Sequence, residues 1–195
     1  MERREAVELL SALPFLGALP LTPGAAQRAA RFVRELRTAP GQAYAPKFFT
    51  AHEWQTARLL ADLVLPKDAR SGSATDAGVP EFMDFILVEY PDHQLWMRGG
   101  LAWLDIETRR RSGKAFVEAD TAQQTKLLDD IAWPDKAPPG LHQGVEFFNR
   151  FRDLTASGFF SSEMGVADLR YLGNRFVVWQ GCPPEQLQKL GVRYP

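Results

Sequence analysis

Helix start and stop signals recur along this chain, and no segment shows the strict apolar–polar alternation of a half-buried strand. Thr50 followed by Glu53 forms a capping box, in which the threonine hydroxyl accepts from the Glu53 amide and the glutamate reaches back. Apolar residues then follow at helical spacing until Pro66. Thr121 with Gln124 predicts a second capping box of the same kind. These signals predict an all-α fold.

Proline and glycine predict the ends of the remaining helices. Pro80 suits the first turn of a helix that Pro91 ends. The next helix, from residue 92 to residue 111, contains Gly99-Gly100 and ends in three arginines, 109–111, which suit the solvated end of a helix. A further helix ends at Gly158, in the position of a C′ glycine. The sequence therefore predicts a single compact bundle of about six or seven helices over residues 49–195.

The first 26 residues are typical of an export signal. Arg3 and Arg4 precede an apolar run over residues 7–21, and paired arginines point to the twin-arginine route, which exports folded proteins. The alternative is an amphipathic first helix, since Glu5 and Glu8 fit a helix better than a signal. Residues 27–48 are predicted as a linker with a short helix.

Composition excludes several classes of function. A formal net charge of −1 argues against nucleic acid as the main partner, since phosphate binding needs a clustered positive surface. One cysteine, Cys182, excludes an internal disulfide and a cysteine zinc site. In an exported protein such a cysteine either pairs with another chain or is a buried thiol.

No motif supplies chemistry to this chain. The spacing around Ser161 and Ser162 does not match a nucleophile elbow, and no phosphate-binding loop is present. None of the three histidines follows a glutamate at the i, i+3 spacing of helical di-iron sites. The sequence therefore predicts no catalytic residue, no cofactor site and no metal site in this chain.

Gly99 and Gly100 each cost about 1 kcal/mol relative to alanine in a helix interior. Close approach of another helix, or of a partner backbone, would offset that cost. Aromatic residues are plentiful and are enriched at protein interfaces. Of Phe159 and Phe160, flanked by Gly158 and Gly165 in a predicted turn, we expect one ring in the core and the other at an interface.

Several stretches together resemble the gluconate 2-dehydrogenase subunit 3 family in their order and spacing. The resemblance covers about residues 48–192 and is carried by HEWQTARLLADLVLP, DAGVPEFMDFIL, RGGLAWLDIETRRRSGKAF, DDIAWP, FFNRFRDLTASGFFSSEMGVADLRYLGN and GCPPE. It implies a small, non-catalytic subunit of a membrane-associated sugar or sugar-acid dehydrogenase, whose own membrane association is indirect. Glu2 departs from the strict twin-arginine pattern, which prefers Ser or Thr there.

The resemblance also implies the partners. A large subunit of the glucose–methanol–choline (GMC) oxidoreductase type would hold FAD and carry out hydride transfer, and a c-type cytochrome with haem c would form a third subunit. The small subunit would help the large one to fold and carry it to the periplasm through Arg3 and Arg4. The residues expected at the partner interface are Trp96, Gly99, Gly100, Trp103, Phe159, Phe160, Tyr171 and Cys182.

Two alternatives stay open at this point. One is a stand-alone hydrolase that uses Ser161 or Ser162 with His142 or His93. The other is an export chaperone or scaffold that binds its client only transiently.

Overall fold

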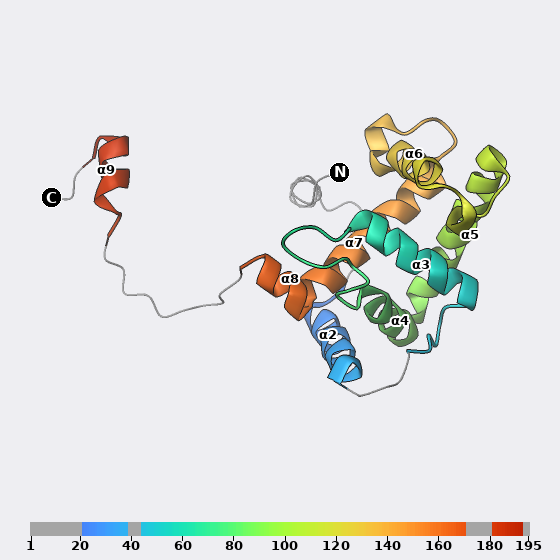
Figure 1. The fold of residues 1–195 in the computed structure, drawn as a ribbon, viewed down its shortest axis with the longest axis horizontal. Helices are drawn as coiled ribbons and strands as arrows, with labels where there is room; N and C mark the ends of the chain where they lie inside the picture. Colours follow the sequence, from blue (N-terminus) through green and yellow to red (C-terminus); the bar gives the residue numbers. More distant parts are fainter. Residues whose placement is uncertain (1–20, 39–43, 171–180, 193–195) are drawn as a thin grey trace.

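The computed structural model describes residues 21–38, 44–170 and 181–192. These residues form eight α-helices and three short 3-10 helices, with no strand among them (Figure 1). The elements are α2 (Pro23–Thr38), α3 (Ala51–Val64), α4 (Val79–Glu89), η1 (Pro91–His93), α5 (Gln94–Ser112), η2 (Phe116–Glu118), α6 (Thr121–Ala132), η3 (Pro134–Lys136), α7 (His142–Ser161), α8 (Glu163–Asp168) and α9 (Pro184–Leu190). The all-α prediction is confirmed.

The predicted capping box is confirmed at the start of α3, and the one at the start of α6 is shifted by one residue. Thr50 caps α3 as expected, with the Glu53 side chain accepting from the Thr50 amide at 2.8 Å. The box predicted at Thr121 and Gln124 is wrong by one position, because the Asp120 carboxylate accepts from the Gln123 amide at 2.8 Å. Gln124 points inward instead, where its amide nitrogen donates to the carbonyl of Phe116 at 2.8 Å.

Helix α7 is longer than predicted. Gly158 was expected to end it, but α7 continues to Ser161, and Gly158 is buried inside the helix beside Phe82. The stop is Ser162, whose hydroxyl accepts from the Gly165 amide at 3.0 Å and so caps α8. The turn predicted to present Phe159 and Phe160 is therefore helical.

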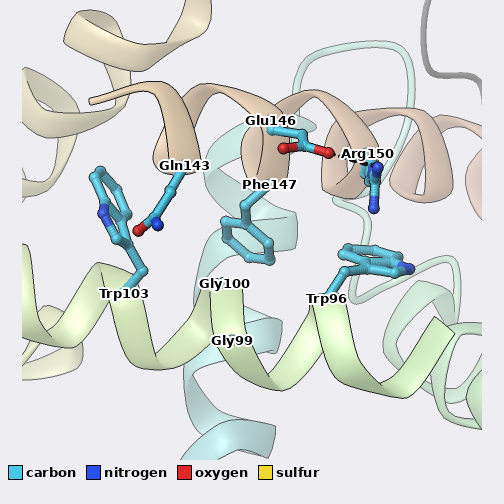
Figure 2. A pocket seen from close by; sticks show the side chains of 8 residues that line it. All are labelled: Trp96, Gly99, Gly100, Trp103, Gln143, Glu146, Phe147 and Arg150. Atoms are coloured by element: carbon cyan, nitrogen blue, oxygen red, sulfur yellow. Dashed lines mark hydrogen bonds and ion pairs between the residues drawn. The ribbon is translucent and has the colours of Figure 1, made fainter. Parts of the chain in front are cut away.

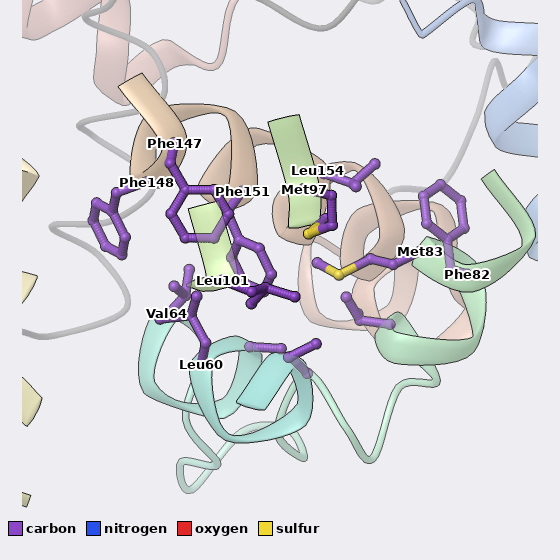
Figure 3. Close-up of a cluster of buried hydrophobic side chains, with 14 of the residues drawn as sticks. Leu60, Val64, Phe82, Met83, Met97, Leu101, Phe147, Phe148, Phe151 and Leu154 are labelled. Carbon is purple, nitrogen blue, oxygen red and sulfur yellow. The ribbon is translucent and has the colours of Figure 1, made fainter. Parts of the chain in front are cut away.

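Helix α7 is the central helix of the bundle and contacts α2, α3, α4, α5, α6 and α8. Figure 3 shows its Phe147, Phe151 and Leu154 packed among side chains of three of these neighbours, α3, α4 and α5. Phe151 is fully buried, as are Leu60 on α3 and Met97 on α5. Because apolar side chains from these four helices meet in one cluster, burial of their surface holds the bundle together.

Helix α2 is the helix expected in the segment 27–48, and it begins earlier, at Pro23. It buries Ala25, Ala29 and Val33 and packs against α4 and α7. Helix α9 lies apart from the bundle and has no buried residue (Figure 1). Arg3, Arg4 and Tyr171 lie outside the described residues.

The buried carboxylate of Asp84 fixes the chain that leads into α3. It accepts hydrogen bonds from the backbone amides of Lys47 and Phe48 at 2.8 and 2.9 Å and from the Tyr44 hydroxyl at 2.6 Å. Burial, and then the hydrogen bond to this carboxylate, raises the pKa of Tyr44. A buried carboxylate is tolerated here because several donors satisfy it.

A charged cluster ties the end of α5 to α6. Glu107 accepts from Arg110 and Arg111 at 2.6 and 2.7 Å, and Arg111 also donates to Asp130 on α6 at 2.7 Å. The arginine run expected as a solvated helix end thus engages carboxylates of two helices. The hydrogen bond from Arg110 lowers the pKa of Glu107 to about 2, while its burial acts in the opposite direction.

We expect the Glu107 cluster to make stability depend on pH. The Glu107 pKa lies below its ordinary value of 4.5, so the contribution is complete above that pH and is lost as pH falls toward 2. With screening at the exposed Arg110, the loss should be about 1–3 kcal/mol. Urea unfolding of the wild type and Glu107→Gln at pH 7 and pH 3 measures it. Glu107→Gln should lose less stability on acidification, whereas Glu35→Gln, an exposed control on α2, should behave as the wild type.

Candidate interaction site between α5 and α7

Helices α5 and α7 approach closely through two reciprocal contacts between a glycine and an aromatic ring. The ring of Phe147 on α7 covers Gly100, where an added Cβ would lie 1.7 Å from its Cδ2 atom. In turn, Trp103 on α5 covers Gly144, where an added Cβ would lie 2.1 Å from the indole. Neither glycine can therefore carry a side chain unless the opposing ring moves.

A groove of about 300 Å³ lies along this contact on the surface (Figure 2). Its lining comes only from the two helices: Trp96, Gly99, Gly100, Trp103, Gln143, Glu146, Phe147 and Arg150. Apolar rings line much of it, while Glu146 and Arg150, paired at 2.6 Å, supply charges of both signs. The indole nitrogen of Trp96 is buried without a hydrogen-bond partner. An aromatic groove with a few polar groups suits a side chain or peptide segment of another protein better than an ion.

The structure brings four of the predicted interface residues together, since Trp96, Gly99, Gly100 and Trp103 all line this groove. Phe159 lies elsewhere and is fully buried in the core. Phe160 is half-buried and packs edge-on against Phe159, with the ring centroids 5.2 Å apart. Cys182 lies just before α9, away from the groove.

The structure does not assemble the residues of the hydrolase alternative. Ser161 and His142 stand at opposite ends of α7, about 28 Å apart at 1.5 Å per residue. The Ser162 hydroxyl bonds the Phe159 carbonyl at 2.6 Å and caps α8. Within the described chain, neither serine hydrogen-bonds a histidine, as a serine nucleophile activated by its base requires.

The sequence analysis did not identify the pair formed by His52 and Asp105. The His52 Nε2 atom lies 2.5 Å from Asp105 Oδ2, and the other Asp105 oxygen accepts from the Phe116 amide at 2.9 Å. The pair joins α3, α5 and η2. No serine or cysteine bonds it in the part of the chain that the structure describes, so its evident role is to hold three elements together.

The described residues contain no group of three or more histidine, cysteine or acidic side chains placed to hold a metal ion. They also contain no helix with the length and apolar character needed to span a bilayer.

A family model described as gluconate 2-dehydrogenase subunit 3 matches residues 51–181, which is more than half of the chain. The match runs from the first residue of α3 to the end of the segment that follows α8, and it includes both helices of the groove. No curated protein and no solved structure matches the chain significantly.

The adjacent glycines of α5 provide a matched pair of variants. Gly100→Ala forces a methyl group into Phe147 and should destabilise the protein by about 1–3 kcal/mol. A Cβ at Gly99 meets nothing within 4 Å, so Gly99→Ala should add up to about 1 kcal/mol through helix propensity. Thermal unfolding at low protein concentration should therefore move the two melting temperatures in opposite directions. Equal effects would contradict the close packing described for Gly100.

Proposed function

Because this chain belongs to the gluconate 2-dehydrogenase subunit 3 family, we propose that it is the non-catalytic small subunit of a periplasmic FAD-dependent sugar or sugar-acid dehydrogenase. The family match over residues 51–181 carries this proposal. In it, a GMC-type flavoprotein holds FAD and transfers the hydride, and a c-type cytochrome accepts the electrons. The small subunit binds the flavoprotein, supports its folding and accompanies it through export.

The groove between α5 and α7 is the surface that we assign to the flavoprotein. Trp96 and Trp103 are partly exposed there, and tryptophan is enriched among residues that dominate binding energy. The Glu146–Arg150 pair beside them can exchange partners with charges on the other protein.

Export by the twin-arginine route accords with the compact bundle. That route carries folded proteins, so a small subunit with the signal can carry a bound partner that has none. The pair Arg3 and Arg4 supplies the signal in this proposal.

Co-expression tests the assigned surface. The chain should co-purify with the GMC-type flavoprotein of the same organism as a stable, stoichiometric, yellow complex, with the FAD absorbance following the flavoprotein when the two are separated. Glu146→Arg should lower the affinity at least about tenfold, because it replaces the Glu146–Arg150 pair with two like charges that a bound surface would have to cover. The matched control is Glu35→Arg, at an exposed position on α2 outside the groove. If the wild-type chain captures no flavoprotein, or leaves it after export as a transient chaperone does, the proposal is wrong.

A second experiment tests export. Changing Arg3 and Arg4 to lysine should retain the flavoprotein in the cytoplasm, because the twin-arginine route reads the arginine pair itself. Fractionation of the cells, with flavin and dehydrogenase activity measured in the periplasm, gives the readout. Periplasmic activity equal to that of the wild type would refute the export role and leave the subunit role standing.

A further inference from the structure

Helix α5 carries an apolar stripe that no other part of the described chain covers. Leu95 is 85% exposed and Ile106 is 64% exposed. The exposed residues Gly99 and Ala102 lie between them on the same face. The four positions are spaced by four, three and four residues, as in a helix that packs along another helix. We call these four residues the α5 stripe.

The stripe differs from the faces that α5 turns toward the core and toward the groove, and it meets the groove at Gly99, which belongs to both. Met97, Leu101 and Leu104 face the core, and each is buried. Trp96 follows Leu95 by one residue, or about 100° around the helix, and faces the groove. A helix that is apolar on opposite faces is normally buried on both. The stripe therefore lacks a covering surface in the single chain.

The glycine at position 99 also indicates that another helix covers the α5 stripe. Gly100 must be a glycine because Phe147 covers it, but the space around Gly99 is open. Nothing inside the described chain compensates the cost of a glycine at this position, about 1 kcal/mol. A second helix that approached the stripe would gain from small residues at its centre, because Gly99 and Ala102 let two backbones come close.

The α5 stripe is complementary to itself when the helix is turned end for end. A two-fold axis at the midpoint of residues 100 and 101 brings Leu95 opposite Ile106 of the second copy, and Gly99 opposite Ala102. Large residues then pack at the two ends, and small residues meet at the crossing point.

The charges follow the same symmetry. Asp92 lies three residues before Leu95 in η1, and Arg109 lies three residues after Ile106 at the end of α5. Both are exposed. The same axis places Asp92 of each copy beside Arg109 of the other, and it opposes the two helix dipoles.

We propose that two copies of this chain associate through antiparallel α5 helices, with the α5 stripe at the interface and reciprocal Asp92–Arg109 pairs at its ends. The stripe and its flanking charges are self-complementary, which is the property that a two-fold interface between identical surfaces requires. The proposal goes beyond the proposed function and does not depend on it. The dimer of small subunits would then bring two copies of the complex together.

The oligomeric state of the purified full-length chain tests the proposal. Sedimentation at concentrations up to about 1 mM should show a concentration-dependent dimer. Leu95→Glu should weaken it at least tenfold by placing a charge in the apolar contact. Val166→Glu changes an exposed valine on α8, on the far side of the bundle from α5 (Figure 1), and should leave the dimer unchanged. A wild-type chain that stays monomeric over this range overturns the proposal.

Charge exchange tests the pairing at the ends. Asp92→Arg and Arg109→Asp should each weaken the dimer several-fold, because each brings like charges together at both ends. The double variant D92R/R109D should restore the wild-type affinity, since the pairs form again with their signs reversed. Additive weakening in the double variant would contradict the antiparallel arrangement.

Disulfide trapping tests the direction of the helices. In a Cys182→Ser background, a mixture of L95C and I106C chains should cross-link efficiently on oxidation. Neither variant should cross-link with itself, because the two positions are about 16 Å apart along the helix. Self-cross-linking of L95C would indicate parallel helices and refute the proposal.

The two proposals fail in different ways. If the chain is monomeric and Leu95→Glu abolishes capture of the flavoprotein, the stripe belongs to the flavoprotein, and only the dimer proposal is wrong. If the chain dimerises as described but captures no flavoprotein, only the proposed function is wrong.

Discussion

The bundle depends on the close contact between α5 and α7. Two glycines, Gly100 and Gly144, each accept an aromatic ring from the opposite helix, so that the two backbones approach where ordinary side chains would separate them. The rings are Phe147 and Trp103, and both also line the surface groove. The contact that positions the central helix therefore also shapes the candidate site. A change in one of these residues would alter the core and the surface together.

This arrangement explains why α5 has so little polar surface outside its last turn. One face packs into the core through Met97, Leu101 and Leu104. A second faces α7 and forms the groove, and a third carries the exposed stripe. Near its end, Arg110 and Arg111 are held by Glu107, and Arg111 also reaches across to Asp130 on α6. A helix with three apolar or aromatic faces in a small domain is what we expect of a chain that works through contact with other proteins.

Helix existence could be predicted from the sequence because caps and prolines act locally. Thr50 with Glu53, and the prolines at positions 80 and 91, set helix ends through groups a few residues apart. The failures came from contacts between distant residues. Gly158 reads as a helix end, yet it lies inside α7, where an added Cβ would be crowded at 3.0 Å from Phe82 on α4. Asp84 gave no signal, since the four donors that it satisfies lie 35–40 residues earlier in the chain.

The same limit applies to the site. The sequence placed Trp96, Gly99, Gly100 and Trp103 at an interface, because glycines in a helix need a compensating contact. It could not show that the contact for Gly100 is Phe147 of the same chain, nor that Gly99 is open. Adjacent positions on a helix differ by about 100° in direction, so one glycine faces a neighbouring helix and the next faces solvent. The first glycine is explained by the fold. The second weakens the isolated chain without improving its packing, and natural proteins often accept such a cost where a surface has a binding function.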